Sequence, residues 1–184
     1  PTNMSLVLKD PWFSVGNTPL IKVTPRLYAK LETVNPTGSI KDRPIKYIVE
    51  KAIALNQIDE QTILVAATSG NTGISLAAIG ASLGLSVKII MPQNMSPERQ
   101  QLIHAFGAEI IYVGNSDFHE AISLRNELCK SPDHWSPMQF ENQLNIDCHR
   151  ETTAQEIISQ LPMGASFSAF VSGAGTGGTI MGVR

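Results

Sequence analysis

Short apolar runs alternate with helix-like segments along most of this chain. The runs that predict strands cover residues 27–31, 62–67, 86–91, 109–113, 138–140 and 168–172. The segments that predict helices cover residues 39–55, 74–83, 97–106, 117–130 and 151–161, and a further helix begins just before Arg184. Because single helices separate the strands, the pattern indicates a parallel sheet with right-handed crossovers.

Particular residues mark the expected ends of these elements. Ser39 and Ser96 precede helix-like segments and are candidate N-caps. Gly84 and Gly107 follow helix-like segments, where a left-handed residue commonly ends a helix. The run Ile63–Ala67 is apolar on both faces, as a strand covered by helices on each side must be. We therefore predict an α/β fold in which a parallel sheet has helices on both faces, and we expect residues 131–137 to form a surface loop.

Composition and charge argue against several classes of partner and site. The 184 residues are 42% hydrophobic and 16% charged, which is ordinary for a globular protein able to bury a core. The net charge is −2 and no basic run stands out, so we expect no nucleic-acid partner. The apolar runs are too short to span a bilayer and no secretory signal is visible, so we expect no membrane partner and a cytoplasmic location. Cys129 and Cys148 form no CxxC pair, which indicates reduced thiols, and the histidine spacings predict no metal site.

A turn at Asn35–Arg43 delivers Lys41 to the first turn of a helix. A lysine must be neutral to attack a carbonyl. The positive end of a helix dipole and burial both lower the pKa of an ammonium group. Lys41 is therefore a candidate for covalent bonding to a carbonyl cofactor, and the alternative is an ordinary solvated lysine.

Two glycine-rich loops each follow an apolar run and precede a helix-like segment. In Thr68–Gly73, backbone N–H groups and hydroxyls can hold an anion, and Asn71 offers an amide donor. The alternative for this loop is a plain turn with capping roles. The second loop, Gly173–Thr179, matches G-x-G-x-x-G, but the acid that a dinucleotide site needs about twenty residues later would lie past Arg184, so the match alone is weak. The loop also lacks the lysine of a P-loop. It is best interpreted as a cradle for a phosphate monoester.

A lysine with two anion cradles indicates a phosphorylated carbonyl cofactor and a substrate carboxylate. Pyridoxal 5′-phosphate acting on an amino acid fits both requirements.

Six motifs then occur in a characteristic order: 16–20 (GNTPL), 35–43 (NPTGSIKDR), 68–73 (TSGNTG), 91–99 (MPQNMSPER), 139–140 (QF) and 175–179 (GTGGT). In these motifs the chain resembles the cysteine synthase and cystathionine β-synthase family of pyridoxal phosphate-dependent enzymes, and it is most similar to the cysteine synthase (O-acetylserine sulfhydrylase) branch. The resemblance implies the tryptophan-synthase-β-like fold type II, with a complete small domain and an incomplete large domain.

The resemblance also implies roles for individual residues. Lys41 would bind the cofactor as a Schiff base and act as the catalytic base, and Asn71 would bond the ring hydroxyl. The residues implied in binding the cofactor phosphate are Gly175, Thr176, Gly177, Gly178 and Thr179. The residues implied in binding the substrate carboxylate are Thr68, Ser69, Gly70, Thr72 and Gln139.

The resemblance implies three segments: residues 1–34 as the start of a large domain, 35–145 as a small mobile domain, and 146–184 as the return to the large domain. Because family members continue past Arg184, we expect a fragment of a longer protein, normally a homodimer. The implied reaction is β-replacement on an activated serine, giving cysteine from sulfide. Alternatives are serine/threonine dehydration, cystathionine β-synthase-type condensation, and a truncated, inactive remnant that serves as a binding or folding unit.

Overall fold

The computed structural model describes residue 6 and residues 12–184, and it contains the predicted parallel sheet. Its strands are β3 (Ile63–Ala67), β4 (Val87–Pro92), β5 (Glu109–Val113) and β6 (His134–Trp135). They lie in the order β5-β4-β3-β6, and all three neighbouring pairs are parallel. The α/β prediction is therefore confirmed, and the strand at residues 109–113 has its predicted bounds.

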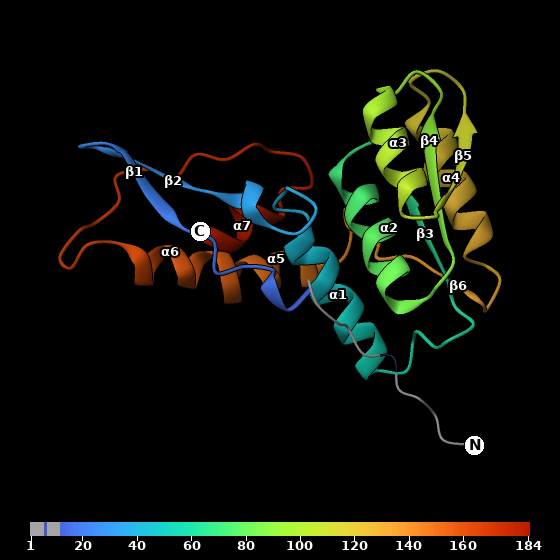
Figure 1. The fold of residues 1–184 in the computed structure, drawn as a ribbon, viewed down its shortest axis with the longest axis horizontal. Coiled ribbons are helices and arrows are strands. Elements are labelled where there is room, and N and C mark those ends of the chain that lie inside the picture. Colours follow the sequence, from blue (N-terminus) through green and yellow to red (C-terminus); the bar gives the residue numbers. More distant parts are fainter. Residues whose placement is uncertain (1–5, 7–11) are drawn as a thin grey trace.

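Helices cover both faces of this sheet (Figure 1). The helices are α2 (Asn71–Leu83), α3 (Pro97–Ala105) and α4 (Phe118–Leu128). Leu64 and Ala66 belong to an apolar cluster that includes side chains of α2 and α3, whereas Val65 and Ala67 pack against side chains of α4. Because side chains alternate between the faces of a strand, β3 must be apolar throughout, as its sequence is. We call β3–β6 with α2–α4 the sheet half.

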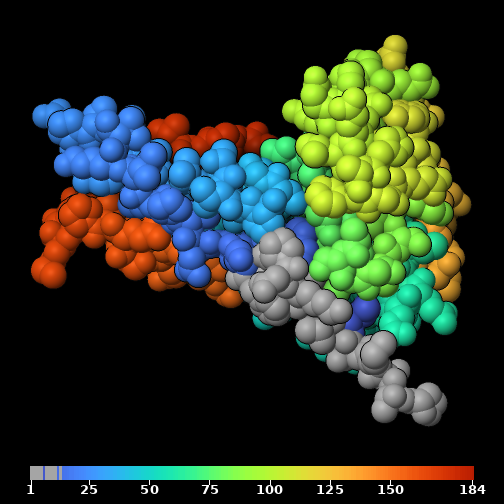
Figure 2. Space-filling model, in the orientation of Figure 1, coloured from blue at the N-terminus to red at the C-terminus, as the bar shows by residue number. Residues whose placement is uncertain are grey.

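The remaining elements form a second body, which we call the terminal half because it joins both ends of the described chain. An antiparallel hairpin, β1 (Leu20–Thr24) and β2 (Leu27–Lys30), lies beside a helical rod. The rod consists of α5 (Gln143–Cys148), a π-helical turn (His149–Thr153) and α6 (Ala154–Gln160), and α7 (Gly178–Val183) packs against it. The helix α1 (Asp42–Ala54) lies between the two halves, which Figure 2 shows as separate masses joined in the middle. The predicted domain boundaries at residues 34/35 and 145/146 stay a prediction.

Two predicted strands are wrong. Residues 138–140 form a turn that leads into α5, in which the Met138 carbonyl accepts hydrogen bonds from the N–H groups of Glu141 and Asn142. The strand instead lies at His134–Trp135, inside the predicted loop, because these residues pair with Ile63 and Leu64 of β3.

Residues 168–172 are not a strand either, since no described segment pairs with them, and a strand without a partner leaves its backbone groups unbonded.

The predicted helix ends are partly right. Gly84 and Gly107 have φ values of +73° and +78°, as left-handed termini require. Ser96 occupies the N-cap position of α3, but its side chain makes no capping hydrogen bond. Ser39 is not the N-cap of α1, because Lys41 holds that position and the Ser39 hydroxyl accepts the Lys41 N–H at 3.2 Å. The hairpin strand β1 and the start of the rod at Gln143 were not predicted.

Candidate functional site

The predicted substrate loop, Thr68–Gly73, lies where the strand order of the sheet reverses. The chain passes from β3 outward to β4 and β5, then returns to β6 on the other side of β3. In open α/β sheets, ligands bind outside the carboxyl ends of the strands at such a switch point. Thr68 directly follows the carboxyl end of β3, and Gln139 follows β6 after a short connection. The fold therefore brings both predicted carboxylate-binding segments to a typical ligand-binding position.

Gln139 contacts the end of β3 directly. Its amide Nε2 donates to the Ala67 carbonyl at 3.4 Å, one residue before Thr68. The residue is 4% exposed, and its Oε1 has no hydrogen-bond partner within the described chain. A buried, unpaired amide oxygen is costly without a ligand or water. This oxygen can accept only from a donor such as a ligand N–H or water, so a contact between Gln139 and a substrate carboxylate would use the second Nε2 proton.

One side chain joins the predicted substrate site, which includes Gln139, to the predicted phosphate loop, Gly173–Thr179. The Asn145 amide Nδ2 donates to the Gln139 carbonyl and to the Thr176 hydroxyl, both at 2.9 Å. The two predicted anion sites, distant in sequence, are thus separated by one asparagine in the fold. Asn145 was not predicted from the sequence, because nothing local distinguishes it from other polar residues at a helix start.

The predicted phosphate loop has the geometry of an anion cradle. Gly177 has a φ value of +81°, and α7 begins at the next residue. Within the described chain the backbone N–H groups of Gly175, Thr176 and Gly177 make no hydrogen bond. A Cβ at position 178 would lie 2.3 Å from the Asn145 Oδ1, so a larger residue there would displace the Asn145 side chain. Free N–H donors with nearby threonine hydroxyls fit the phosphate of pyridoxal phosphate.

Lys41 sits half-buried at the start of α1, and burial lowers its pKa, as the predicted chemistry requires. Its charge also acts on His149, which is fully buried and 3.4 Å (Nε2) from the Thr179 hydroxyl. Burial, reinforced by the positive charges of Lys41 and Arg43, lowers the pKa of His149 to about 4. The charge of Lys41 and the hydroxyl of Thr179 therefore both act on one buried, neutral histidine.

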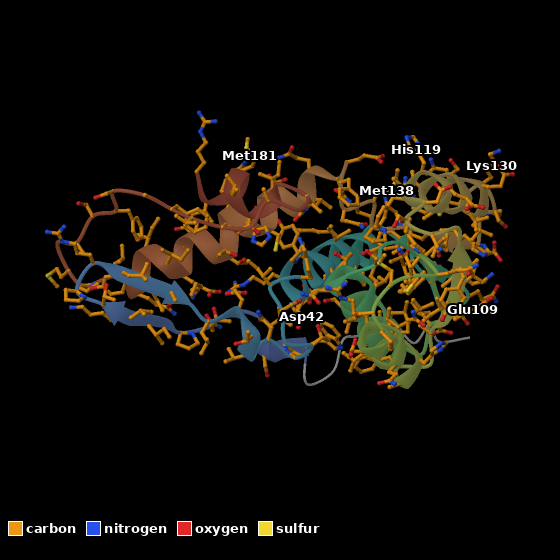
Figure 3. The ribbon with its side chains drawn as sticks, turned by 90° about the horizontal axis from the view of Figure 1, so that it is seen from above. Asp42, Glu109, His119, Lys130, Met138 and Met181 are labelled. Atoms are coloured by element: carbon orange, nitrogen blue, oxygen red, sulfur yellow. The ribbon has the colours of Figure 1, made fainter. Side chains whose placement is uncertain are left out.

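Hydrogen bonds fix the Lys41 turn to α2. The Asp42 carboxylate accepts the Thr37 N–H at 2.7 Å, the Thr37 hydroxyl, and the Ser75 hydroxyl at 2.6 Å. Ser75 lies one turn into the helix that follows the substrate loop. In Figure 3, Asp42 lies where the two halves meet, whereas the labelled Glu109, His119 and Lys130 lie in the sheet half, away from this junction.

The remaining predicted residues are placed as follows. Thr68, Ser69 and Gly70 are half-buried, and the Thr68 hydroxyl accepts the Gly70 N–H at 3.3 Å. Thr72 is buried and Asn71 is exposed at the first position of α2. No hydrogen bond within the described chain joins Asn71 to Lys41 or to residues 173–179, so its predicted contact with the cofactor ring stays a prediction.

Other features lie outside this site. A groove of about 270 Å³ runs between the second half of α1 and the turn before α5, with Trp135 and Leu144 among its lining residues. Cys129 and Cys148 are both free. Among the described residues no helix combines the length and hydropathy needed to cross a bilayer, and no group of three or more His, Cys, Asp or Glu side chains is arranged to hold a metal.

The chain is similar to several known proteins. A family model described as pyridoxal-phosphate dependent enzyme matches residues 12–184. A cysteine synthase of Flavobacterium sp. is 39% identical over 178 residues, covering 92% of this chain and 57% of the relative. Cysteine synthase B of Campylobacter jejuni is 43% identical over 174 residues, covering 92% of this chain and 58% of the relative. The chain thus spans less than two thirds of the length of these relatives.

Two solved structures share the fold. A hydrogen sulfide-producing enzyme from Fusobacterium nucleatum has a TM-score of 0.87 at 40% identity, over 92% of this chain and 54% of that one. An O-acetylserine dependent cystathionine β-synthase from Helicobacter pylori has a TM-score of 0.85 at 36% identity, over 94% and 59%. The predicted fold and cofactor class are confirmed at the level of the family. Because the family model covers nearly the whole described sequence, this chain belongs to the family of pyridoxal-phosphate-dependent enzymes.

Proposed function

We propose that the protein containing this chain catalyses pyridoxal phosphate-dependent β-replacement on an activated serine, giving cysteine from sulfide. One observation carries the proposal: Asn145 joins a predicted carboxylate site to a predicted phosphate site. The charge of Lys41, whose own pKa is lowered by burial, acts on the histidine beside that phosphate site. The names of the relatives support the choice of reaction, because the curated relatives described above are cysteine synthases.

Each predicted residue has a physical task. When bound, pyridoxal phosphate supplies an aldehyde that bonds covalently to amines and a conjugated ring that withdraws electrons from the α-carbon of an amino acid. Lys41, once released from the cofactor, is an amine that removes the proton at that α-carbon. The N-terminus of α2, with Thr68, Ser69, Gly70 and Thr72 and the Gln139 amide, binds the substrate carboxylate. Asn71 orients the ring, and residues 175–179 hold the phosphate.

The predicted movement of residues 35–145 toward the substrate would exclude water from this site. A homodimer and a cytoplasmic location are further proposals that follow from the family resemblance. Light scattering on the purified protein and cell fractionation test them.

The lysine assignment has a direct test. Lys41→Ala is expected to abolish the visible absorbance of covalently bound cofactor, because no other amine is assigned to that bond. Lys51→Ala is the matched control, since Lys51 lies in the same helix with its amine 5.2 Å from the Tyr47 ring centroid, and it should keep the absorbance. An unchanged spectrum in Lys41→Ala would refute the assignment.

A second reaction is favoured by one comparison, the structural relative named as an O-acetylserine dependent cystathionine β-synthase. Offering the protein an activated serine with sulfide, with homocysteine or without a thiol separates the possibilities. Cysteine, cystathionine and a ketoacid are the respective products of synthase, condensing and dehydratase activity. A protein that loses all colour on desalting would instead favour the binding or folding unit.

A further inference from the structure

Two side chains that the proposed mechanism does not use hold the threonines of the phosphate loop. Asn145 and His149 are four residues apart in the helical rod, and they are 3% and 0% exposed. The Asn145 Nδ2 lies 2.9 Å from the Thr176 hydroxyl, and the His149 Nε2 lies 3.4 Å from the Thr179 hydroxyl. Residues four apart on a helix share one face, so the rod presents both groups to α7 together.

The facing helix is shaped for these two side chains. Gly178 and Gly182 are also four residues apart, in α7. A Cβ on Gly178 would lie 2.3 Å from the Asn145 Oδ1, and a Cβ on Gly182 would lie 2.5 Å from the His149 Cβ. Real Cβ atoms do not approach this closely. The two glycines therefore let α7 sit near enough for Asn145 and His149 to reach the loop.

We propose that Asn145 and His149 are positioning residues that turn the hydroxyl protons of Thr176 and Thr179 toward the phosphate of the cofactor. The inference rests on the proposed function and deepens it. The Thr176 oxygen accepts from Asn145 and from the Gly178 N–H, which leaves its own proton free to be donated.

His149 acts in the same way through one tautomer. Its Nδ1 lies 2.9 Å from the Thr153 hydroxyl. The proposal assigns the tautomer in which Nδ1 accepts from that hydroxyl, so that Nε2 carries the proton and donates to Thr179. Burial keeps the ring neutral, as its lowered pKa indicates, so the ring orients the hydroxyl without adding charge. The Asn145 Oδ1, which has no hydrogen-bond partner in the described chain, is the second buried atom left for a ligand or ordered water at this loop.

The test compares two ligands that differ only in the phosphate. The affinities for pyridoxal phosphate and for pyridoxal are measured on the full-length protein after its cofactor has been removed. Asn145→Ala and His149→Ala should each lower the affinity for pyridoxal phosphate about tenfold, which is the size of one lost or misdirected hydrogen bond to a charged group. The affinity for pyridoxal should change by less than about twofold. His149→Gln, which keeps a donor near the Nε2 position, should retain affinity, whereas His149→Asn should not.

Controls separate positioning from folding. Gln143→Ala changes an exposed residue in the same rod and should bind both ligands normally. Thr176→Val removes the hydroxyl without changing a residue of the rod, and it should give the same phosphate-selective loss of affinity. Adding Asn145→Ala to Thr176→Val should then weaken binding little further, because the two residues act through one contact.

Equal losses for both ligands, no loss for pyridoxal phosphate, or additive effects in the double variant would overturn the inference while leaving the proposed function intact. A parent protein that binds no pyridoxal phosphate would overturn both.

Discussion

The sheet half and the terminal half are stabilised by different forces. In the sheet half, fully buried side chains such as Leu64, Val65, Ile89 and Ile90 fill two apolar clusters on either side of the sheet. In the terminal half, large apolar side chains remain exposed: Val23 is 53%, Leu27 is 54% and Val171 is 90% exposed. Within the described chain, this second half has too little buried apolar surface to be held together in the same way.

A charged network joins the terminal half to α1 instead. The Arg43 guanidinium, 3% exposed, contacts the carboxylates of Glu32 and Glu156 at 2.7 Å each. Glu156 also contacts Lys30 at 2.7 Å and accepts the Asn17 N–H at 2.9 Å. One carboxylate of α6 thus ties the hairpin, α1 and the preceding loop together. Hydrophobic burial depends little on pH, whereas such a network fails once its carboxylates are protonated, so the two halves should respond differently to perturbation.

The largest difference is expected from Arg43→Met, which leaves two largely buried carboxylates without their main counter-charge. Removing one partner of a buried ion pair costs about 3–5 kcal/mol. Hydrogen exchange should quicken in α6, while the fluorescence of Trp12 and Trp135, which pack on the sheet-half core, changes less. Adding Glu156→Gln should recover part of the loss. A cost below about 1 kcal/mol would show that the network is not what holds the terminal half.

A matched pair of leucine substitutions tests the apolar side of the comparison. Leu64→Ala deletes a fully buried side chain and should lower the free energy of unfolding by about 2–5 kcal/mol. Leu27→Ala, at a side chain that is 54% exposed, should change it by less than about 0.5 kcal/mol. Urea denaturation followed by tryptophan fluorescence and by circular dichroism measures both. Similar losses of unfolding free energy at the two positions would mean that Leu27 stabilises the hairpin by packing as much as Leu64 stabilises the sheet half.

Acid should weaken the terminal half in two steps. His149 titrates at about 4 in the folded protein instead of 6.5, so the unfolded chain takes up its proton first and stability falls between these pH values, by about 3 kcal/mol. For Glu156, burial raises the pKa, but hydrogen bonds from Arg43 and Lys30 outweigh it and lower the pKa to about 2 from 4.5. Its contribution is therefore present above pH 4.5 and is lost as the pH falls toward 2.

Variants assign the two steps. His149→Gln should flatten the upper part of a plot of unfolding free energy against pH, and Glu156→Gln should flatten the lower part. If His149→Gln left the upper slope unchanged, another group would be responsible for it.

The smallest effect is expected from a pair of glycines in the terminal half. Gly182→Ala places a methyl group against His149 and the backbone of the rod and should cost about 1–3 kcal/mol. Gly173→Ala meets nothing within 4 Å and should be nearly neutral. Thermal melts compare the two. Equal melting temperatures would show that α7 shifts away from the rod at little cost.

The sequence by itself determined the central strands of the sheet half and the glycines that end two of its helices. Five consecutive apolar residues at Ile63–Ala67 and the left-handed Gly84 and Gly107 are local features, and local features depend only on neighbouring residues. Lys41 and the two glycine-rich loops were predicted as site residues in the same way, because the predicted chemistry is carried by short motifs.

Tertiary structure alone decided the rest. The strand His134–Trp135 exists because β3 pairs with it, whereas residues 168–172 have no partner in the described chain and stay irregular despite a strand-like pattern. The contacts of Asn145 and His149 with Thr176 and Thr179 exist only because the rod packs against α7, which lies about thirty residues later in the chain. The physical reason is the same in each case: a short pattern predicts which conformation a segment prefers, but only the folded arrangement supplies the partner that its hydrogen-bonding groups and side chains require.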